Sequence, residues 1–234
     1  LKTVRRVPWW NRDLLLETMV DSRKRKQAES DLLRLTRLHE LLTRISLTYI
    51  SLPVDRLEDA IEVSLGELGR ELEADRTSLF DYALDHGSCR NTHEWCATGV
   101  CPWSYARQAV ALSVLAEWAA RHRQGEVVHV LDVAAQPESD LRQLLLERED
   151  RSLIAVPMMD GERCLGFALF ESTRRQRVFL DAEQRLLQVF AQMLVSVRRR
   201  LTLGLAIRRS HDEAEQASRA KSEFLATMSH EIRT

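Results

Sequence analysis

Two adjacent residues near the carboxyl end of the chain, His230 and Glu231, have the chemistry of a phosphoryl acceptor. An imidazole nitrogen attacks phosphorus competently when the ring is unprotonated and exposed. A neighbouring carboxylate can hold the proton of one ring nitrogen, which leaves the other nitrogen free to attack. An unreactive histidine on a charged surface helix would show the same pair. The residues around the pair must therefore decide between the two interpretations.

The segment from Lys221 to Thr234 has the periodicity of a helix. Its apolar residues recur at spacings of three and four, which places on one stripe Phe224, Leu225, Met228 and Ile232. The polar residues lie off that stripe, toward water or a partner: Ser229, His230, Glu231 and Thr234. The pair is therefore expected on the open face of an amphipathic helix.

The run F-L-A-T-M-S-H-E-I-R-T, from Phe224 to Thr234, resembles the phosphoacceptor box of sensor histidine kinases, F-L-A-x-M-S-H-E-[IL]-R-T-P. The resemblance implies that His230 is the phosphoacceptor and that Glu231 is its acid/base partner. It also implies that Thr234 positions water for dephosphorylation. In the full-length protein it implies ATP with Mg as the donor, a kinase ATP-binding domain, and a response-regulator receiver domain whose aspartate takes the group. No residues of this chain resemble a nucleotide site, so we expect the chain alone to be inactive as a kinase.

Length and composition limit the number of domains and the classes of partner. A chain of 234 residues should hold one or two domains. A net charge of −1 gives no field that would favour nucleic acid, so no nucleic-acid partner is predicted. The four cysteines, with no signal peptide, favour reduced thiols and a cytoplasmic location. No apolar run reaches the roughly 20 residues that a membrane helix needs. We expect the chain to be part of a larger protein.

The first residues join basic side chains to paired tryptophans, as far as Trp10. Trp and Arg both favour a membrane interface, so this stretch is either a juxtamembrane segment or a linker between cytoplasmic domains. Attachment to the inner membrane through upstream sequence is left open. Asn11 or Asp13 is expected to cap the helix that follows.

From Ala28 onward the chain predicts a coiled-coil helix. Its seam steps by three and four through Leu32, Leu35, Leu38, Leu42, Ile45 and Tyr49. A second such helix is predicted from Asp181, with the seam Leu187, Phe190, Leu194, Val197 and Leu201. We expect both to form a parallel homodimer that has near its twofold axis Leu38, Leu42, Leu194 and Val197. In the second helix, Leu205 breaks the spacing and Gly204 costs about 1 kcal/mol against alanine, so we expect Gly204→Ala to stabilise the connector and to lock its output.

Residues 54–180 mix strands with helices. Strands are predicted over 77–84, 89–95, 126–131, 152–158 and 163–172, with turns at Gly87 and Gly161. Helices are predicted over 54–74, 113–123 and 138–148. The pattern indicates an α+β domain of the size of a sensor domain.

Several ordered blocks of this region resemble a GAF domain: N-T-H-E-W-C, R-Q-G-E-V-V-H-V-L-D-V-A, R-S-L-I-A-V-P-M, D-G-E-R-C-L-G-F and F-L-D-A-E-Q-R-L-L. The resemblance implies a GAF-type antiparallel sheet with flanking helices, between long N- and C-terminal coiled-coil helices. The expected division is a linker and signalling helix over 1–34, a GAF sensor domain over 35–198, and over 199–234 a connector and the start of the dimerisation and phosphoacceptor domain. The alternative is a non-catalytic ligand-binding or dimerisation module in which His230 is inert.

The sequence does not identify the ligand of such a domain. Cyclic-nucleotide GAF domains carry an N-K-x-D-E type signature, and bilin-binding ones carry a cysteine closely followed by histidine or an Asp-x-Cys-Phe loop; the chain has neither. His93, Cys96 and Cys101 form H-x2-C-x4-C, residue types that suit Zn, Cu or Fe, and a structural site would need Glu94 or Cys89 as a fourth ligand. The competing interpretation is that Cys96 is a small buried apolar residue and Cys101 a loop residue. We favour the second interpretation and predict no metal.

Overall fold

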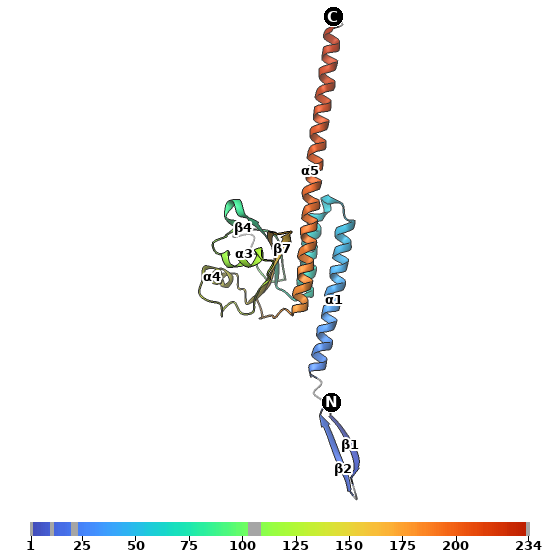
Figure 1. Cartoon of the computed structure of the whole chain (residues 1–234), viewed down its shortest axis with the longest axis vertical. Coiled ribbons are helices and arrows are strands. Elements are labelled where there is room, and N and C mark those ends of the chain that lie inside the picture. Colours follow the sequence, from blue (N-terminus) through green and yellow to red (C-terminus); the bar gives the residue numbers. More distant parts are fainter. Residues whose placement is uncertain (1, 10–11, 20–22, 103–108, 233–234) are drawn as a thin grey trace.

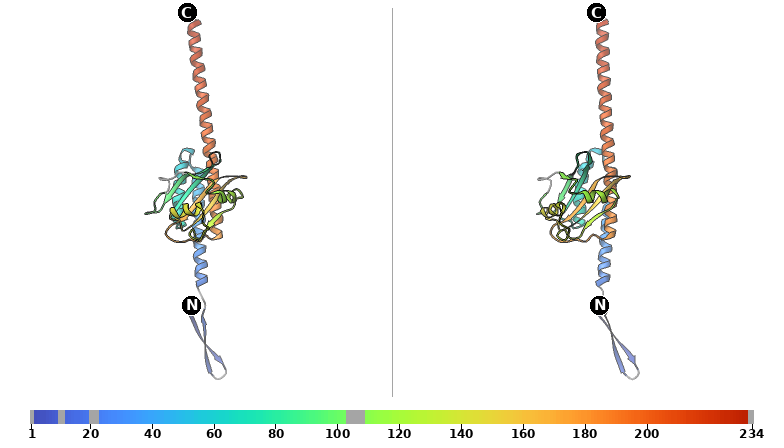
Figure 2. Two further views of the ribbon diagram at one scale, coloured as in Figure 1. Left: turned by 90° about the vertical axis from the view of Figure 1, so that its left-hand side faces the viewer. Right: turned by 60° about the vertical axis from the view of Figure 1, so that its left-hand side comes forward.

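A computed structural model describes the backbone of residues 2–9, 12–19, 23–102 and 109–232, and the side chains of residues 24–102, 109–216 and 218–219. Within these ranges, no helix combines the length and the apolar character needed to span a membrane. Figure 1 shows a sheet domain attached to the side of two long helices, and Figure 2 shows the amino-terminal hairpin and the end of the last helix at opposite ends of the molecule.

The domain is built on a six-stranded antiparallel sheet with the order β5-β4-β3-β8-β7-β6. Its strands are β3 (Arg76–Ala83), β4 (Ser88–Cys96), β5 (Ala109–Ala111), β6 (Val128–Val130), β7 (Ser152–Asp160) and β8 (Arg163–Ser172). Gly87 (φ 57°) and Gly161 (φ 63°) supply the left-handed residues of the two predicted turns. The expected α+β fold with an antiparallel sheet is confirmed. Of the six strands of this sheet, β5 alone was not predicted; its sequence, Ala-Val-Ala, has one β-branched residue, whereas the equally short β6 lies in a longer β-branched run.

Both faces of the central strands are buried, and side-chain alternation decides which core each residue joins. On β7, Ile154 and Val156 enter one core, whereas Leu153 and Ala155 enter the other. On β8, Ala168 and Phe170 belong to the first core, while Phe167 and Leu169 belong to the second. Each face of the sheet therefore needs its own covering layer.

Three helices cover the first face: α1 (Arg23–Ser51), α2 (Leu57–Glu71) and α5 (Asp181–Ile232) (Figure 1). A short 3₁₀ turn, η1 (Val54–Arg56), joins α1 to α2, and a second one, η2 (Leu84–His86), lies between β3 and β4. The second face carries two shorter helices, α3 (Ala116–Arg123) and α4 (Asp140–Glu147). Ser139 caps α4, because its hydroxyl accepts from the Arg142 N–H at 3.1 Å. The predicted helices and their order agree with the structure, apart from their ends.

The amino-terminal prediction needs correction. Residues Lys2–Trp9 (β1) and Arg12–Met19 (β2) pair as an antiparallel hairpin, and α1 starts only at Arg23. Asp13 lies inside β2 and cannot cap a helix, and Asn11 lies outside the described residues. The β-branched residues Thr3, Val4 and Val7 favour a strand at this position.

The placement of the predicted dimer seams was also wrong. Leu38, Leu42, Leu194 and Val197 are between 0% and 2% exposed within a single chain. They form one core with α2 and the sheet, so they are not available to a twofold axis. The heptad spacing is real, but it describes how α1 and α5 pack inside one chain, because intramolecular and intermolecular helix packing need the same apolar stripe.

Gly204 has a packing role that its sequence position did not reveal. A Cβ atom added there would lie 2.8 Å from Cγ1 of Val54 in η1, closer than ordinary contact. The gain in helix propensity expected from Gly204→Ala is therefore opposed by a clash with Val54. That this position switches the output stays a prediction.

Trp95 on β4 depends on two further glycines. A Cβ on Gly66 would lie 2.9 Å from the indole, and a Cβ on Gly69 would overlap its six-membered ring. Arg70, one residue later on α2, lies over the same ring, 5.6 Å from its centroid. Because these two glycines lack side chains, α2 can approach β4 closely, and the indole fills the space between the helix and the strand.

Gly69→Ala should therefore lower the free energy of unfolding by about 1–3 kcal/mol, the usual cost of overpacking, although alanine is the better helix former. Urea denaturation of the purified chain measures the change. The matched control is the Gly69→Ala change in a Trp95→Leu background, where the clash is absent and the substitution should be neutral or stabilising. A gain of about 1 kcal/mol in the otherwise unchanged chain would contradict the packing argument.

Candidate functional site

The predicted acceptor residues lie at the far end of α5. The helix runs without interruption from Asp181 to Ile232, so His230 and Glu231 have helical backbone, as their spacing predicted. Their side chains are outside the described residues, and so is Thr234. The roles assigned to these three residues remain predictions.

Three consecutive arginines hold α5 where it leaves the domain. Arg198 pairs with Asp81 of β3, and Arg199 pairs with Asp160 at the end of β7. Arg200 donates to the backbone oxygens of Tyr49 and, at 3.0 Å, Leu52 at the end of α1. Because successive helical residues point about 100° apart, neighbouring side chains reach three different elements. No local pattern around this run indicates these partners, so the sequence did not predict this arginine clamp.

The suggested metal group is not assembled. Strand alternation sends His93 toward α2, where its Nε2 lies 2.8 Å from Oε2 of Glu58. Cys96, three residues later, faces the opposite side of the sheet. Burial, helped by the charge of Glu94, raises the pKa of the Cys96 thiol to about 11, which opposes thiolate formation. Within the described part of the chain, no three His, Cys, Asp or Glu residues form a group that could hold a metal ion.

On the side that Cys96 faces lies a buried ionic cluster: Arg76, Arg148, Asp150 and Glu171. Arg76 donates from Nε to Glu171 at 2.9 Å and from a terminal nitrogen to Asp150 at 2.8 Å. Arg148 contacts the same two carboxylates. Burial raises the pKa of Asp150, and the Glu171 charge raises it further. Burial opposes ionisation of Glu171 too, but Arg148 and Arg76 outweigh it and lower that pKa.

The cluster joins elements that are distant in sequence. Arg76 starts β3, Glu171 lies near the end of β8, and Arg148 and Asp150 precede β7. None of the four has an apolar stripe or a motif around it, so sequence reasoning could not have brought them together. Completely paired and buried, they hold structure in place rather than form an open reactive site.

The second face of the sheet carries an aromatic cluster around Phe167. Phe80 stacks on Phe167 with ring centroids 5.0 Å apart, and Trp118 meets it edge-on at 6.1 Å. The Tyr82 hydroxyl lies 2.7 Å from Nδ1 of His122. Burial raises the pKa of Tyr82 and lowers that of His122 to about 4, so an uncharged phenol and a neutral imidazole share this hydrogen bond at neutral pH. This face is a packed core containing one polar pair.

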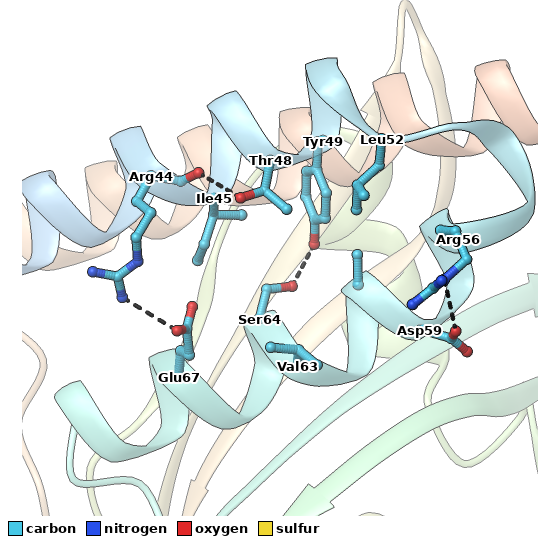
Figure 3. Close-up of a pocket in the computed structure, with 11 residues that line it drawn as sticks. Arg44, Ile45, Thr48, Tyr49, Leu52, Arg56, Asp59, Val63, Ser64 and Glu67 are labelled. Carbon is cyan, nitrogen blue, oxygen red and sulfur yellow. Dashed lines mark hydrogen bonds and ion pairs between the residues drawn. The ribbon is translucent and has the colours of Figure 1, made fainter.

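A hollow of about 340 Å³ opens between α1 and α2 (Figure 3). Tyr49 from α1 reaches across to the hydroxyl of Ser64 on α2, and Arg44 reaches Glu67 at 3.2 Å (Figure 3). Exposed apolar side chains lie in the same two helices: Leu47, Ile50 and Val63. Single exposed apolar side chains are ordinary on a protein surface, so these assign no role to the hollow.

Comparison with known proteins gives a family and one curated relative. The GAF domain family model matches residues 56–196. A protein of Pseudomonas aeruginosa described as sensor histidine kinase AruS is 38% identical over 103 residues, covering 42% of this chain. The chain spans only 9% of the length of that relative.

Solved structures of the same fold include the GAF domain of a phosphoenolpyruvate-protein phosphotransferase from Coxiella burnetii. Its TM-score is 0.60 at 18% identity, covering 74% of this chain and 98% of that one. The phycocyanobilin-bound GAF domain of a cyanobacterial phytochrome has a TM-score of 0.60 at 18% identity, covering 71% and 96% respectively. At this identity the likeness concerns the fold, and the family also contains domains that bind a ligand.

His122 should make stability depend on pH. Its pKa is lowered by burial from 6.5 to about 4, so between these values the unfolded chain binds a proton that the folded chain does not. The stability is fully present above pH 6.5 and should fall by about 1.4 kcal/mol per pH unit down to about pH 4. Urea denaturation across this range measures the slope.

His122→Phe should remove this component of the slope, whatever its effect on stability at pH 7. His86→Gln, at an exposed position in η2, is the matched control and should keep the original slope. An identical slope in His122→Phe and in the unaltered chain would contradict the assignment.

Proposed function

The chain belongs to the GAF domain family, and on that premise we propose that it is the sensory and phosphoacceptor region of a sensor histidine kinase. It is a GAF sensory domain related to a sensor histidine kinase and to ligand-binding GAF domains. The finer part of the proposal is that His230 takes a phosphoryl group from ATP bound by a kinase domain elsewhere in the full-length protein. A receiver-domain aspartate then takes the group from His230.

The observation that carries the proposal is the continuity of α5. Leu187, Phe190 and Leu194 of this helix lie in the core against the sheet, and the same helix continues to the acceptor-like residues. A rigid helix transmits a shift or rotation of its packed end to its free end. The sensory domain and the predicted acceptor are therefore mechanically connected without an intervening loop.

The proposed chemistry is a single displacement. A ring nitrogen of His230 attacks the γ-phosphorus, a nitrogen–phosphorus bond forms, and the bond from that phosphorus to the β–γ bridging oxygen breaks. ADP leaves with the electron pair. Glu231 holds the proton of the other ring nitrogen and stabilises the positive charge that develops on the ring.

We also propose that the protein is a homodimer, through surfaces different from the predicted seams. Beyond Arg208, which lies 3.8 Å from Asp55, α5 extends away from the domain (Figure 1). Just before Arg208, Leu203 and Ile207 lie one helical turn apart and are 63% and 69% exposed. An isolated helix with leucines in water is marginal, so a second copy of the chain along this stripe would stabilise it.

The acceptor prediction is tested by labelling. Mixed with the intact kinase core of its own full-length protein and ATP, the chain should acquire acid-labile phosphate, and His230→Gln should acquire none. His211→Gln, on the exposed part of the same helix, is the matched control and should be labelled normally. Label that persists in His230→Gln would remove His230 from the mechanism, and no label in any protein would favour the non-catalytic module.

The dimer prediction is tested by sedimentation. Leu203→Glu together with Ile207→Glu should weaken association by at least about 100-fold, because a dimer would bury both charges. Leu205→Glu is the matched control: Leu205 is 64% exposed but lies about 200° around the helix from Leu203. An unchanged dimer in the double variant, or equal loss in the control, would place the interface elsewhere.

A further inference from the structure

A hollow of about 650 Å³ lies at one end of the sheet, outside the aromatic cluster. Its walls come from the end of β3, the segment before and including α3, and the β7–β8 hairpin. The side chains that define it are Tyr82, Leu112, Ala116, Ala119, Arg123 and Cys164. Its volume is in the range of small-molecule sites in proteins, about 300–1,000 Å³.

The floor of the hollow is apolar and uncharged. Burial raises the pKa of the Tyr82 hydroxyl and of the Cys164 thiol, so both stay protonated at neutral pH. The hydrogen bond between Tyr82 and His122, at 2.7 Å, fixes the phenol, and the ring packs against Phe167 with centroids 5.6 Å apart. The floor is therefore rigid before any ligand arrives, which lowers the entropy cost of binding.

The rim of the hollow carries more positive than negative charge. Arg123 and Arg163 border it, opposed only by Glu162. Arg123 donates from Nε to the backbone oxygen of Ala119 at 3.1 Å, which holds its guanidinium group at the edge. Within the described residues, neither arginine has an ion-pair partner. A guanidinium without a carboxylate partner beside an apolar floor suits an anionic group on an apolar body.

Two walls of the hollow also hold α5. On β3, Tyr82 faces the hollow, while its neighbour Asp81 faces the other way and pairs with Arg198. On the β7–β8 hairpin, residues 162–164 border the hollow, and Asp160 pairs with Arg199. A ligand that moves either wall must therefore move a carboxylate that grips α5.

We propose that this hollow binds a small, largely apolar anion, such as an aryl or alkyl carboxylate, and that α5 senses its occupancy through the Asp81–Arg198 and Asp160–Arg199 pairs. The coupling rests on the proposed sensory role of the domain, whereas the binding does not. A ligand can shift α5 only as far as its affinity differs between the two positions of the walls.

Binding is tested by calorimetric titration of the purified chain with phenylacetate and its neutral isostere phenylacetamide. Phenylacetate should bind with a dissociation constant on the order of 1 mM, as expected for a ligand of this size, and about 5- to 10-fold more tightly than the amide. Arg123→Gln should abolish the preference for the anion. Ala116→Trp, which fills the hollow, should abolish binding of both compounds.

The matched control is Glu117→Trp, at an exposed position about 100° around the same helix from Ala116, which should bind phenylacetate normally. No binding of phenylacetate at 20 mM, about twenty times the expected dissociation constant, would overturn the proposal. Equal binding by Ala116→Trp would also overturn it, because the compound would then occupy another surface.

Coupling is tested by hydrogen exchange of residues 196–210 with and without saturating phenylacetate. Exchange in this part of α5 should change at least about twofold in the unaltered chain. In Asp81→Asn combined with Asp160→Asn, binding should persist and the change in α5 should disappear. Asp140→Asn, exposed in α4, is the control.

An α5 that exchanges identically with and without ligand would overturn the coupling, as would a change that survives in the double variant. Neither measurement involves His230. Failure here therefore leaves the phosphoacceptor prediction standing, and failure of phosphorylation leaves the binding and coupling results standing.

Discussion

The fold depends on the burial of both faces of its central strands. Because β7 and β8 alternate apolar residues to either side, neither face of the sheet can be left in water. One face needs α1, α2 and α5, and the other needs α3, α4 and the aromatic cluster. A slip of one residue would exchange the two cores, so the register must be held firmly. Arg76 and Glu171, opposite each other in the β3–β8 register and bonded through their side chains, fit only one register.

Burying the charged side chains of the ionic cluster costs free energy, and their pairing with one another offsets that cost. Taking Arg76, Arg148 and Glu171 out of water is unfavourable, and only complete pairing makes their burial tolerable. The raised pKa of Asp150 has the same origin, because burial and the neighbouring Glu171 both oppose its charged form. The cluster therefore adds specificity of pairing rather than net stability, and it does so at the end of the sheet opposite to the arginine clamp on α5.

The helix α5 has two roles that compete for the same side chains. Its apolar stripe is used within the domain, so this stripe cannot also join two chains. Past Leu201 the domain contacts only the side of the helix that holds Gly204 and Arg208, and another stripe, including Leu203 and Ile207, is left open. The arginine clamp lies at the boundary between the part of α5 that packs on the domain and the part that extends beyond it. A helix held by exchangeable ion pairs at such a boundary is easier to bias than one held only by apolar packing, because ion pairs at a wet surface contribute little each.

Apart from the amino-terminal hairpin and β5, the sequence by itself determined the element types, the α+β class, the antiparallel hairpin at Gly161, the family and the long final helix, because periodicity, turn residues and contiguous motifs are local properties. Tertiary structure alone decided which partner each apolar stripe found: Leu42 and Leu194 pack within one chain although their spacing is equally suited to two. It also decided that His93 and Cys96 point apart, that Gly204 meets Val54, and that three arginines form a clamp. These outcomes depend on residues far apart in sequence, and no local pattern encodes which distant surface will lie opposite.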